Sequence, residues 1–268
     1  MRTLLHLSDI HFGRFDDSLE RPFFRAVAQI EPAVVVVSGD LTQRARPGQF
    51  RQARQFLNAL PGPKIVVPGN HDVPLHNVYH RLSAPLASYR RYITDNLEPF
   101  YQDEELAVLG VNTARALIWK NGRINARQIA RIRDRFCRVA PGTTKVLVTH
   151  HPFDLPDGYT SRDLVGRARL AMITVADCGI DLLLAGHFHI GRAGHTAVRY
   201  SSAGHSSIFV QAGTLSTRGR GEPPSFNVLR ILPERLEVDR HAFDESSGVF
   251  VKKLVEVFER GPGGWRPA

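Results

Sequence analysis

Residues 3–12 read TLLHLSDIHF, an apolar run that passes directly into a polar segment carrying Asp9 and His11. Each apolar run of this kind has the composition of a buried strand. Because open α/β sheets bind ligands beyond the carboxyl ends of their strands, we expect such polar ends to gather in one site. The same change from apolar to polar recurs in AVVVVSGDLT (33–42), KIVVPGNHD (64–72), KVLVTHHP (145–152) and DLLLAGHFH (181–189).

The rest of the chain predicts α/β order followed by a second, mainly antiparallel sheet packed on the first with helices outside. Strands are expected near 3–7, 33–38, 64–67, 106–111, 145–149 and 181–185. Helices are expected between them, near 19–30, 47–59, 83–94, 125–138 and 162–178. After residue 190 we expect short β-like runs near 195–201, 206–212, 225–232, 235–243 and 249–257.

The length of 268 residues and an apolar content of 43% are ordinary for one large domain with its own core. We expect that domain to span 1–259. The last residues, 260–268, end in GPGGWRPA and are expected to form a flexible tail. The two cysteines, Cys137 and Cys178, are too few for a disulfide framework, so free thiols in the core are expected.

The N-terminus runs straight into the first polar motif without the apolar region of a signal peptide, and no stretch has the length of a transmembrane helix. We therefore expect a cytoplasmic protein. The formal net charge is +9, which raises nucleic acid as a partner. The tightest basic cluster is Arg127, Arg131, Arg133 and Arg135. Three of these, Arg127, Arg131 and Arg135, have the spacing of a solvated helix face, so nucleic-acid binding is not favoured. The sequence leaves the oligomeric state open, a homodimer included.

The polar strand ends carry Asp, His and Asn but no Cys, which are donors that suit Mn, Fe, Zn or Co. Seven such side chains are too many for one catalytic ion with an open position. They suit two ions that share a bridging carboxylate. The expected cofactors are therefore two divalent metal ions held by Asp9, His11, Asp40, Asn70, His150, His187 and His189.

The order D-x-H, G-D, G-N-H-D, H and G-H-x-H over residues 9–189 resembles the calcineurin-like metallophosphoesterase superfamily. The resemblance implies an α/β fold, a four-layer αββα sandwich with two mixed sheets and the dinuclear site at the strand ends. It implies that Asp40 bridges the two ions. It further assigns Asp9, His11 and His189 to the first ion, and Asn70, His150 and His187 to the second.

The resemblance also implies that His71 faces the substrate and donates a proton to the leaving oxygen or stabilises the transition state. Asp72 follows in the chain and is expected to orient that imidazole. The implied site stays slightly cationic, which suits a phosphate ester. The expected mechanism is in-line attack of a metal-bridging hydroxide on phosphorus.

Protein Ser/Thr phosphatases of the superfamily extend the second motif as GDxxDRG, whereas this chain reads GDLTQRA with Gln43 at the Asp position. The motif context is instead similar to class III cyclic-nucleotide phosphodiesterases, which implies hydrolysis of 3′,5′-cyclic AMP or a related small phosphodiester. A nuclease or a lipid-precursor pyrophosphatase is the alternative. A non-catalytic scaffold is the least favoured reading, because a scaffold needs neither the ligand set nor His71.

Substrate contacts are the least determined part of the site. Phe12 and Arg14 follow the first motif and could stack on a base or pair with phosphate, although an inward-packed Phe and a solvated Arg fit equally well. Asn112 and Arg115 lie in VNTAR (111–115), at the end of another strand, and are the second pair of candidates. His76 and His80 are expected to belong to a polar lid within residues 74–105.

Overall fold

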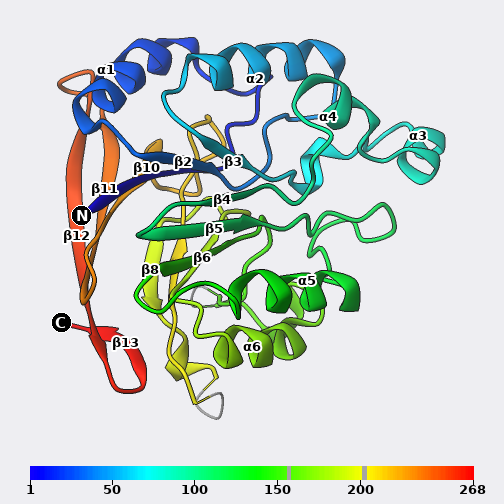
Figure 1. The fold of residues 1–268 in the computed structure, drawn as a ribbon. Helices are drawn as coiled ribbons and strands as arrows, with labels where there is room; N and C mark the ends of the chain where they lie inside the picture. Colours follow the sequence, from blue (N-terminus) through cyan, green and yellow to red (C-terminus); the bar gives the residue numbers. More distant parts are fainter. Residues whose placement is uncertain (156–157, 201–203) are drawn as a thin grey trace.

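The computed structural model describes residues 1–155, 158–200 and 204–268. Two β-sheets lie face to face, and helices cover the outer face of each sheet (Figure 1). The expectation of a four-layer αββα sandwich with two mixed sheets is confirmed.

The first sheet has seven strands in the order β13-β12-β11-β10-β1-β2-β3. Strands β1, β2 and β3 run parallel, and the pairs from β1 to β13 are antiparallel. The bounds are β1 Arg2–Leu7, β2 Val34–Val37, β3 Lys64–Val66, β10 Ser225–Ile231, β11 Arg235–Asp244, β12 Val249–Gly261 and β13 Gly264–Pro267.

The second sheet has six strands in the order β4-β5-β6-β7-β9-β8. Its four central strands are parallel, and the two edge strands pair antiparallel. The run expected at 195–201 is instead the end of β8 and the turn η4 (Thr196–Val198), and residue 201 lies outside the described residues. The bounds are β4 Phe100–Gln102, β5 Leu106–Gly110, β6 Thr144–Val148, β7 Leu182–Ala185, β8 Arg192–His195 and β9 Ile208–Gln211.

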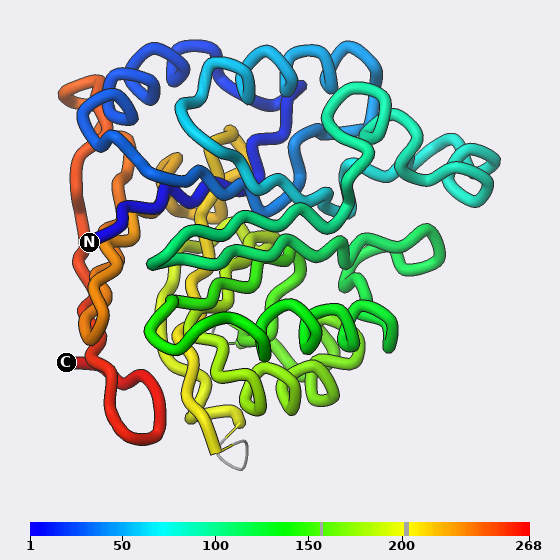
Figure 2. Tube along the Cα trace, in the orientation of Figure 1, coloured from blue at the N-terminus to red at the C-terminus, as the bar shows by residue number. Residues whose placement is uncertain are grey.

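The helices lie outside the sheets, with α1 and α2 over the first sheet and α5 and α6 over the second (Figure 2). Of the helix expected at 83–94, only α4 forms, and it begins after Pro85; the preceding short helix, α3, ends at Ser83. In the described ranges no helix is long and apolar enough to cross a membrane. The bounds are α1 Glu20–Ile30, α2 Pro47–Ala59, α3 Val78–Ser83, α4 Ala87–Tyr92, α5 Ala126–Phe136 and α6 Ala168–Asp177, with short turns η1 Asp17–Leu19, η2 Asn70–Asp72 and η3 Ser161–Asp163.

Strand β2 shows why the parallel strands read as continuous apolar runs. Val34 and Val36 point into the core between the two sheets, whereas Val35 and Val37 point toward the layer of α1 and α2. Successive side chains of a strand alternate between faces, and both faces of this strand are covered. All four valines are fully buried. This central position fixes the strand ends that carry the polar motifs.

The C-terminal residues form an ordered hairpin, so the expected flexible tail at 260–268 is wrong. Strand β12 continues to Gly261, and β13 pairs back onto it. Trp265 is only 2% exposed, and its indole N–H donates to the carboxylate of Asp181 at 2.8 Å. The Gly-Pro-Gly-Gly segment is therefore the turn of the hairpin, and the buried indole docks it onto the second sheet.

The cysteines are not free thiols. Cys137, at the end of α5, is joined to Cys178, at the end of α6, by a disulfide. The two residues are 41 apart in sequence and come together because α5 and α6 pack side by side on the second sheet. The prediction of free thiols is wrong for that reason.

Candidate metal centre

The carboxyl ends of five parallel strands meet at one edge of the sandwich and bring the polar motifs together. The loop after β1 contacts both sheets: the backbone N–H of Asp9 donates to the carbonyl of Gly39 at 3.0 Å, and its carboxylate accepts from the backbone N–H of His187 at 2.9 Å. The motif residues that follow these strands are Asp9 and His11 (β1), Asp40 (β2), Asn70 (β3), His150 (β6), and His187 and His189 (β7).

One group of four buried side chains, Asp9, His11, Asp40 and His189, has its ligand atoms close enough to hold one metal ion. His189 Nε2 lies 3.1 Å from Asp9 Oδ1 and 3.1 Å from His11 Nε2. His11 Nε2 lies 3.7 Å from Asp40 Oδ2. Two ligand atoms that each lie about 2.1 Å from one ion are about 3 to 3.5 Å apart, so the two 3.1 Å spacings fit a shared ion and the 3.7 Å spacing is slightly wider.

A second group lies on the other side of Asp40. Asn70 Oδ1 is 3.1 Å from His150 Nε2 and 3.1 Å from His187 Nδ1. His150 Nε2 is also 3.4 Å from Asp40 Oδ2. The Asp40 carboxylate therefore contacts both groups, as a carboxylate that bridges two ions must do.

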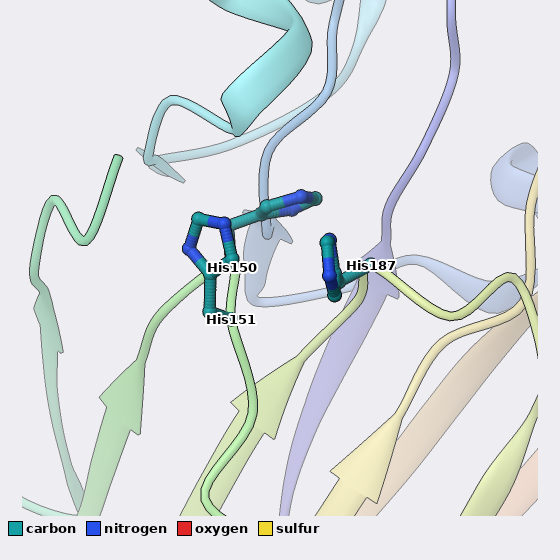
Figure 3. Close-up of side chains that lie close together, drawn as sticks. All are labelled: His150, His151 and His187. Carbon is teal, nitrogen blue, oxygen red and sulfur yellow. The ribbon is translucent and has the colours of Figure 1, made fainter. Parts of the chain in front are cut away.

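His151 was not singled out from the sequence, although it adjoins His150. Figure 3 shows His150 and His151 together with His187, whose ring lies 4.8 Å from that of His151 between centroids. The three residues could together hold a metal ion. However, His151 Nδ1 is 2.7 Å from the hydroxyl of Thr113, and the shorter spacings within the second group belong to Asn70. We therefore place His151 behind the second group.

The buried carboxylates make the site a strong attractor for positive charge. Burial opposes the ionisation of Asp9, but His189, His11 and His150 together outweigh it and hold the pKa of Asp9 well below its usual range. For Asp40, burial is likewise outweighed by His150, His71 and His11 together, and the pKa is lowered. Burial lowers the pKa of His150, but Asp40 more than reverses this and raises the pKa to about 9. The negative electrostatic potential of the carboxylates, which keeps this proton on His150, would also attract a metal cation.

Carbonyl groups orient the imidazoles toward the centre. His150 Nδ1 lies 2.8 Å from the carbonyl of Ser38, and His189 Nδ1 lies 2.9 Å from the carbonyl of Arg218. A carbonyl only accepts, so each Nδ1 carries the proton and each Nε2 turns its lone pair to the site. Asp9 Oδ1 is buried and has no hydrogen-bond partner within the described part of the chain. This donor set and the unpartnered oxygen fit a metal pair.

The backbone at the site is strained. Five candidate ligands have positive φ angles between 50° and 78°, in the left-handed region that non-glycine residues rarely adopt. Each such residue costs on the order of 1–3 kcal/mol. The five are Asp9, His11, Asp40, His187 and His189. Gly69 allows the loops to approach closely, because a Cβ there would collide with the Asp40 carboxylate.

Asp72 does not contact the His71 imidazole, which corrects the role expected for it. His71 Nδ1 instead lies 3.0 Å from the carbonyl of Gln43, and its backbone N–H donates to Asp40 at 2.8 Å. The Asp72 carboxylate accepts from the backbone N–H groups of Gly69, Leu41 and Thr42 at 2.9, 3.1 and 2.9 Å. Burial, together with the charge of Asp40, raises the pKa of Asp72 to about 7.

The candidate substrate contacts fall into two regions. Phe12 is 6% exposed and packs against the rings of Phe15 and Phe56, at centroid distances of 5.2 and 5.7 Å, so it belongs to the core. Of the two alternatives for Phe12, the structure shows the inward-packed one. Arg14 is exposed, and its carbonyl accepts from the backbone N–H of Thr217 at 3.1 Å.

Asn112 and Arg115 line a groove of about 740 Å³ whose other walls include Val73, Leu86 and Leu117. The side chain of Asn112 accepts from the backbone N–H of Ala114 at 2.9 Å, and Arg115 donates to the Asn112 carbonyl at 3.0 Å. Val73 directly follows the η2 turn that carries Asn70 and His71. His76 and His80 line a different hollow, beside Arg44.

Sequence reasoning missed Arg218, which lies in the loop between β9 and β10. Its Nη1 is 3.3 Å from His71 Nε2 and 3.2 Å from His11 Nε2. In the sequence Arg218 follows long after the last polar motif, and no recognisable motif surrounds it. Its position depends on how this loop packs against the site.

The family model for the calcineurin-like phosphoesterases matches residues 2–191, which include every motif residue of the two groups. The chain belongs to the calcineurin-like phosphoesterase family. This establishes the expected superfamily, and with it a metal-binding phosphoesterase domain.

Curated relatives and solved structures agree with this membership. The chain is 24% identical to a cAMP/cGMP dual specificity phosphodiesterase of Mycobacterium tuberculosis over 261 residues, covering 87% of this chain and 76% of the relative. It is 38% identical over 80 residues to the glycerophosphodiester phosphodiesterase GpdQ of Enterobacter lignolyticus, covering 26% of this chain and only 29% of that protein. The purple acid phosphatase PPD1 of yellow lupin (Lupinus luteus) is similar in fold, with a TM-score of 0.71 and 12% identity over 95% of this chain and 53% of the lupin chain.

Proposed function

We propose that the protein is a dinuclear-metal phosphodiesterase that hydrolyses 3′,5′-cyclic nucleotides or related small phosphodiesters. The observation that carries the proposal is the contact of one carboxylate, Asp40, with both groups of candidate ligands. A single structural metal site would need neither the second group nor a shared carboxylate. Membership of the phosphoesterase family supports the reaction class.

In this proposal Asp40 would contact both ions, and each group would supply three further ligands. Asp9, His11 and His189 would hold the first ion, and Asn70, His150 and His187 would hold the second. Oxygen and imidazole donors suit Mn, Fe, Zn or Co. When bound, the ion pair supplies Lewis acidity toward the phosphoryl oxygens and activates water for the attack on phosphorus.

His71 is the proposed proton donor or hydrogen-bond donor to the leaving oxygen. The Gln43 carbonyl accepts from Nδ1, so the ring donates from Nε2 only in its doubly protonated form, which loses the Nε2 proton to the leaving oxygen. Hydrogen bonding of one ring nitrogen to a carbonyl fixes the orientation of the other. General acid catalysis by such a group contributes about 10²- to 10⁴-fold to the rate.

The proposed place for the alcohol or nucleoside part of the substrate is the groove lined by Asn112 and Arg115. Val73 forms part of its wall and adjoins the turn of His71, so the groove begins beside the site. A phosphodiester is favoured over a phosphoprotein because Gln43 stands where the protein phosphatases have Asp. The phosphodiesterase names of both curated relatives support the same substrate class.

The test is hydrolysis of a bis-aryl phosphodiester, the matching monoester and 3′,5′-cyclic AMP, each with added manganese. We expect the diester to be cleaved faster than the monoester, and cyclic AMP to be turned over. Asp40→Ala should abolish metal-dependent turnover, whereas Asp134→Ala, which alters an exposed carboxylate on α5 that is paired with Arg138, should leave it unchanged. Full activity in Asp40→Ala would overturn the proposal.

The alternative is a nuclease or a lipid-precursor pyrophosphatase of the same family. Cleavage of the aryl diester without turnover of cyclic AMP would favour this alternative. It would show that the metal-dependent chemistry is intact but that a small cyclic nucleotide is not the substrate. The groove walls include Leu86, Leu97 and Leu117, which gives an acyl chain an apolar surface. A substrate panel with nucleic-acid and lipid-linked diesters would then separate the two.

A further inference from the structure

The loop between β9 and β10 places a guanidinium group at the open side of the candidate site. We propose that Arg218 binds the phosphoryl group of the substrate through the non-bridging oxygens and is a catalytic residue of the hydrolysis. This inference rests on the proposed phosphoesterase function. It adds a residue outside the metal motifs to the groups that contact the substrate.

The guanidinium lies between the two residues that flank the reaction centre. Arg218 Nη1 is 3.3 Å from His71 Nε2, the atom assigned to the leaving oxygen. It is 3.4 Å from His11 Nδ1 and 3.2 Å from His11 Nε2. Near-equal distances to both ring nitrogens place it over the face of that imidazole, so the in-plane lone pair of His11 Nε2 stays available to a metal ion.

The loop that carries Arg218 is anchored to the strand ends. The hydroxyl of Thr214 donates to the carbonyl of Asp9 at 2.6 Å and accepts from the backbone N–H of Ser216 at 3.0 Å. The carbonyl of Arg218 itself accepts from His189 Nδ1 at 2.9 Å. Both the backbone of the arginine and the first ligand group therefore share one rigid frame, as positioned catalytic groups require.

Charge explains what the guanidinium is ready to bind. Burial lowers the pKa of Arg218, and the carboxylates of Asp40 and Asp9 act against this. Metal ions on those carboxylates would offset their negative charge at the half-buried guanidinium. A phosphoryl group supplies two anionic oxygens that match the fork of a guanidinium.

On substrate binding Nη1 exchanges its contact with His71 Nε2 for a phosphoryl oxygen. This exchange frees His71 Nε2 to contact the leaving group. Negative charge grows on the non-bridging oxygens during the attack, and the arginine donates its N–H groups to them. No bond to Arg218 forms or breaks. Removing one such preorganised donor commonly costs about 10²- to 10³-fold in rate.

The experiment compares Arg218→Ala, Arg218→Lys and the matched control Arg220→Ala in the metal-loaded protein. Arg220 is in the same loop, but its guanidinium donates to the hydroxyl of Tyr159. We expect kcat for the aryl diester to fall about 10²- to 10³-fold in Arg218→Ala, and by less in Arg218→Lys. Added guanidinium should restore part of the Arg218→Ala activity. Arg220→Ala should stay within about twofold of the wild type.

A structural role is separated by two further readouts, metal stoichiometry and calorimetric binding of inorganic phosphate. We expect two ions per chain in every variant and phosphate binding at least about tenfold weaker in Arg218→Ala alone. Loss of metal ions from Arg218→Ala, without rescue by guanidinium, would overturn the catalytic role. Wild-type rates and phosphate affinity in Arg218→Ala would also overturn it.

A failure of the proposed function gives different results from a failure of the Arg218 proposal. If the wild type binds two ions but hydrolyses none of the esters, the phosphodiesterase proposal fails while phosphate binding still tests Arg218. Weaker phosphate binding in Arg218→Ala than in the wild type would then support the anion site. Equal binding would reject it.

Discussion

Thr42 donates two hydrogen bonds to the carboxylate of Asp72, one from its backbone N–H and one from its hydroxyl, each 2.9 Å long. Asp72 belongs to the turn that carries Asn70, and Thr42 to the loop that carries Asp40. The pair therefore joins two loops that supply candidate ligands to the second ion. Asp72 acts on the loops, and the Gln43 carbonyl holds the imidazole of His71.

Asp72→Asn should weaken the second metal site more than it slows chemistry. The amide keeps the shape of the side chain but presents an NH₂ group to one of the loop N–H donors. We expect metal affinity to fall about 10- to 100-fold, as for other residues that support ligands, with kcat nearly restored at saturating manganese. Metal titration followed by activity measures both. A kcat that stays low in the fully loaded variant would instead return Asp72 to the chemistry.

His71→Ala should show the opposite behaviour. We expect two ions to remain bound, because His71 is in neither ligand group, and kcat to fall about 10²- to 10⁴-fold for a diester with a poor leaving group. Activated leaving groups such as nitrophenolate need less help, so the loss should be smaller for them. Equal losses for both leaving groups would contradict a role at the leaving oxygen.

His6 should make the stability of the metal-free protein depend on pH. It is fully buried in β1, 2.9 Å from the Ser38 hydroxyl, and burial lowers its pKa from 6.5 to about 3, against the pull of Asp9. Between these values the unfolded chain binds a proton that the folded chain does not. Stability from this residue is complete above pH 6.5 and is lost as the pH falls toward 3, on the order of 2 kcal/mol by pH 5.

Denaturant unfolding at pH 7.5 and pH 5, with chelator present, measures how the free energy of unfolding changes between these two pH values. His6→Gln should reduce the difference between the two pH values. His80→Gln is the matched control, because His80 is exposed and should leave the difference unchanged. An undiminished pH difference in His6→Gln would assign it to other groups.

Replacing both cysteines with serine should lower stability without loss of turnover. The disulfide closes a loop of 41 residues, which in a chain-entropy treatment is worth about 4 kcal/mol. For a domain of this size that is a fall of about 10 °C in Tm. The disulfide lies between α5 and α6 on the outer face of the second sheet, away from the ligand strands' ends. Reductant should lower the Tm of the wild type to that of the variant, and identical starting Tm values would argue against a formed disulfide.

The disulfide also bears on where the protein works. Cytoplasmic residence was expected from the N-terminal sequence and stays a prediction. Disulfides persist mainly in oxidising compartments. A formed bond between Cys137 and Cys178 therefore counts against residence in a reducing compartment such as the cytoplasm. The test is to count the free thiols of protein taken directly from its source, with thiols blocked at lysis. No free thiols would indicate the disulfide and an oxidising compartment, and two free thiols would indicate a reducing one.

The sequence predicted the parts of the molecule that depend on local pattern. The apolar runs gave the parallel strands within one or two residues, and the polar strand ends gave the two groups of candidate ligands. Both follow from the rule that neighbouring parallel strands end at one edge of a sheet. Pro85 is a local signal that was overlooked: in the range 83–94 the helix begins only after it, at Ala87.

What the sequence could not predict depends on contacts between distant segments. The Cys137–Cys178 bond needs the packing of α5 against α6, and the docked hairpin needs the buried site that receives Trp265. The position of Phe12 beside His11 left it open between the pocket and the core, and only its packing against Phe56 on α2 decides for the core. Arg218 has no motif, and only the packing of its loop brings it to His71.

The left-handed backbone at five candidate ligands has a consequence for engineering. Glycine adopts that conformation without strain, so a Gly substitution at Asp9, His11, Asp40, His187 or His189 removes a penalty and a buried charge or imidazole together. A thermal-stability screen on metal-free protein would therefore enrich variants that no longer bind metal. Heat resistance and catalysis compete for the same five positions, and library members should be ranked by metal retention before melting temperature.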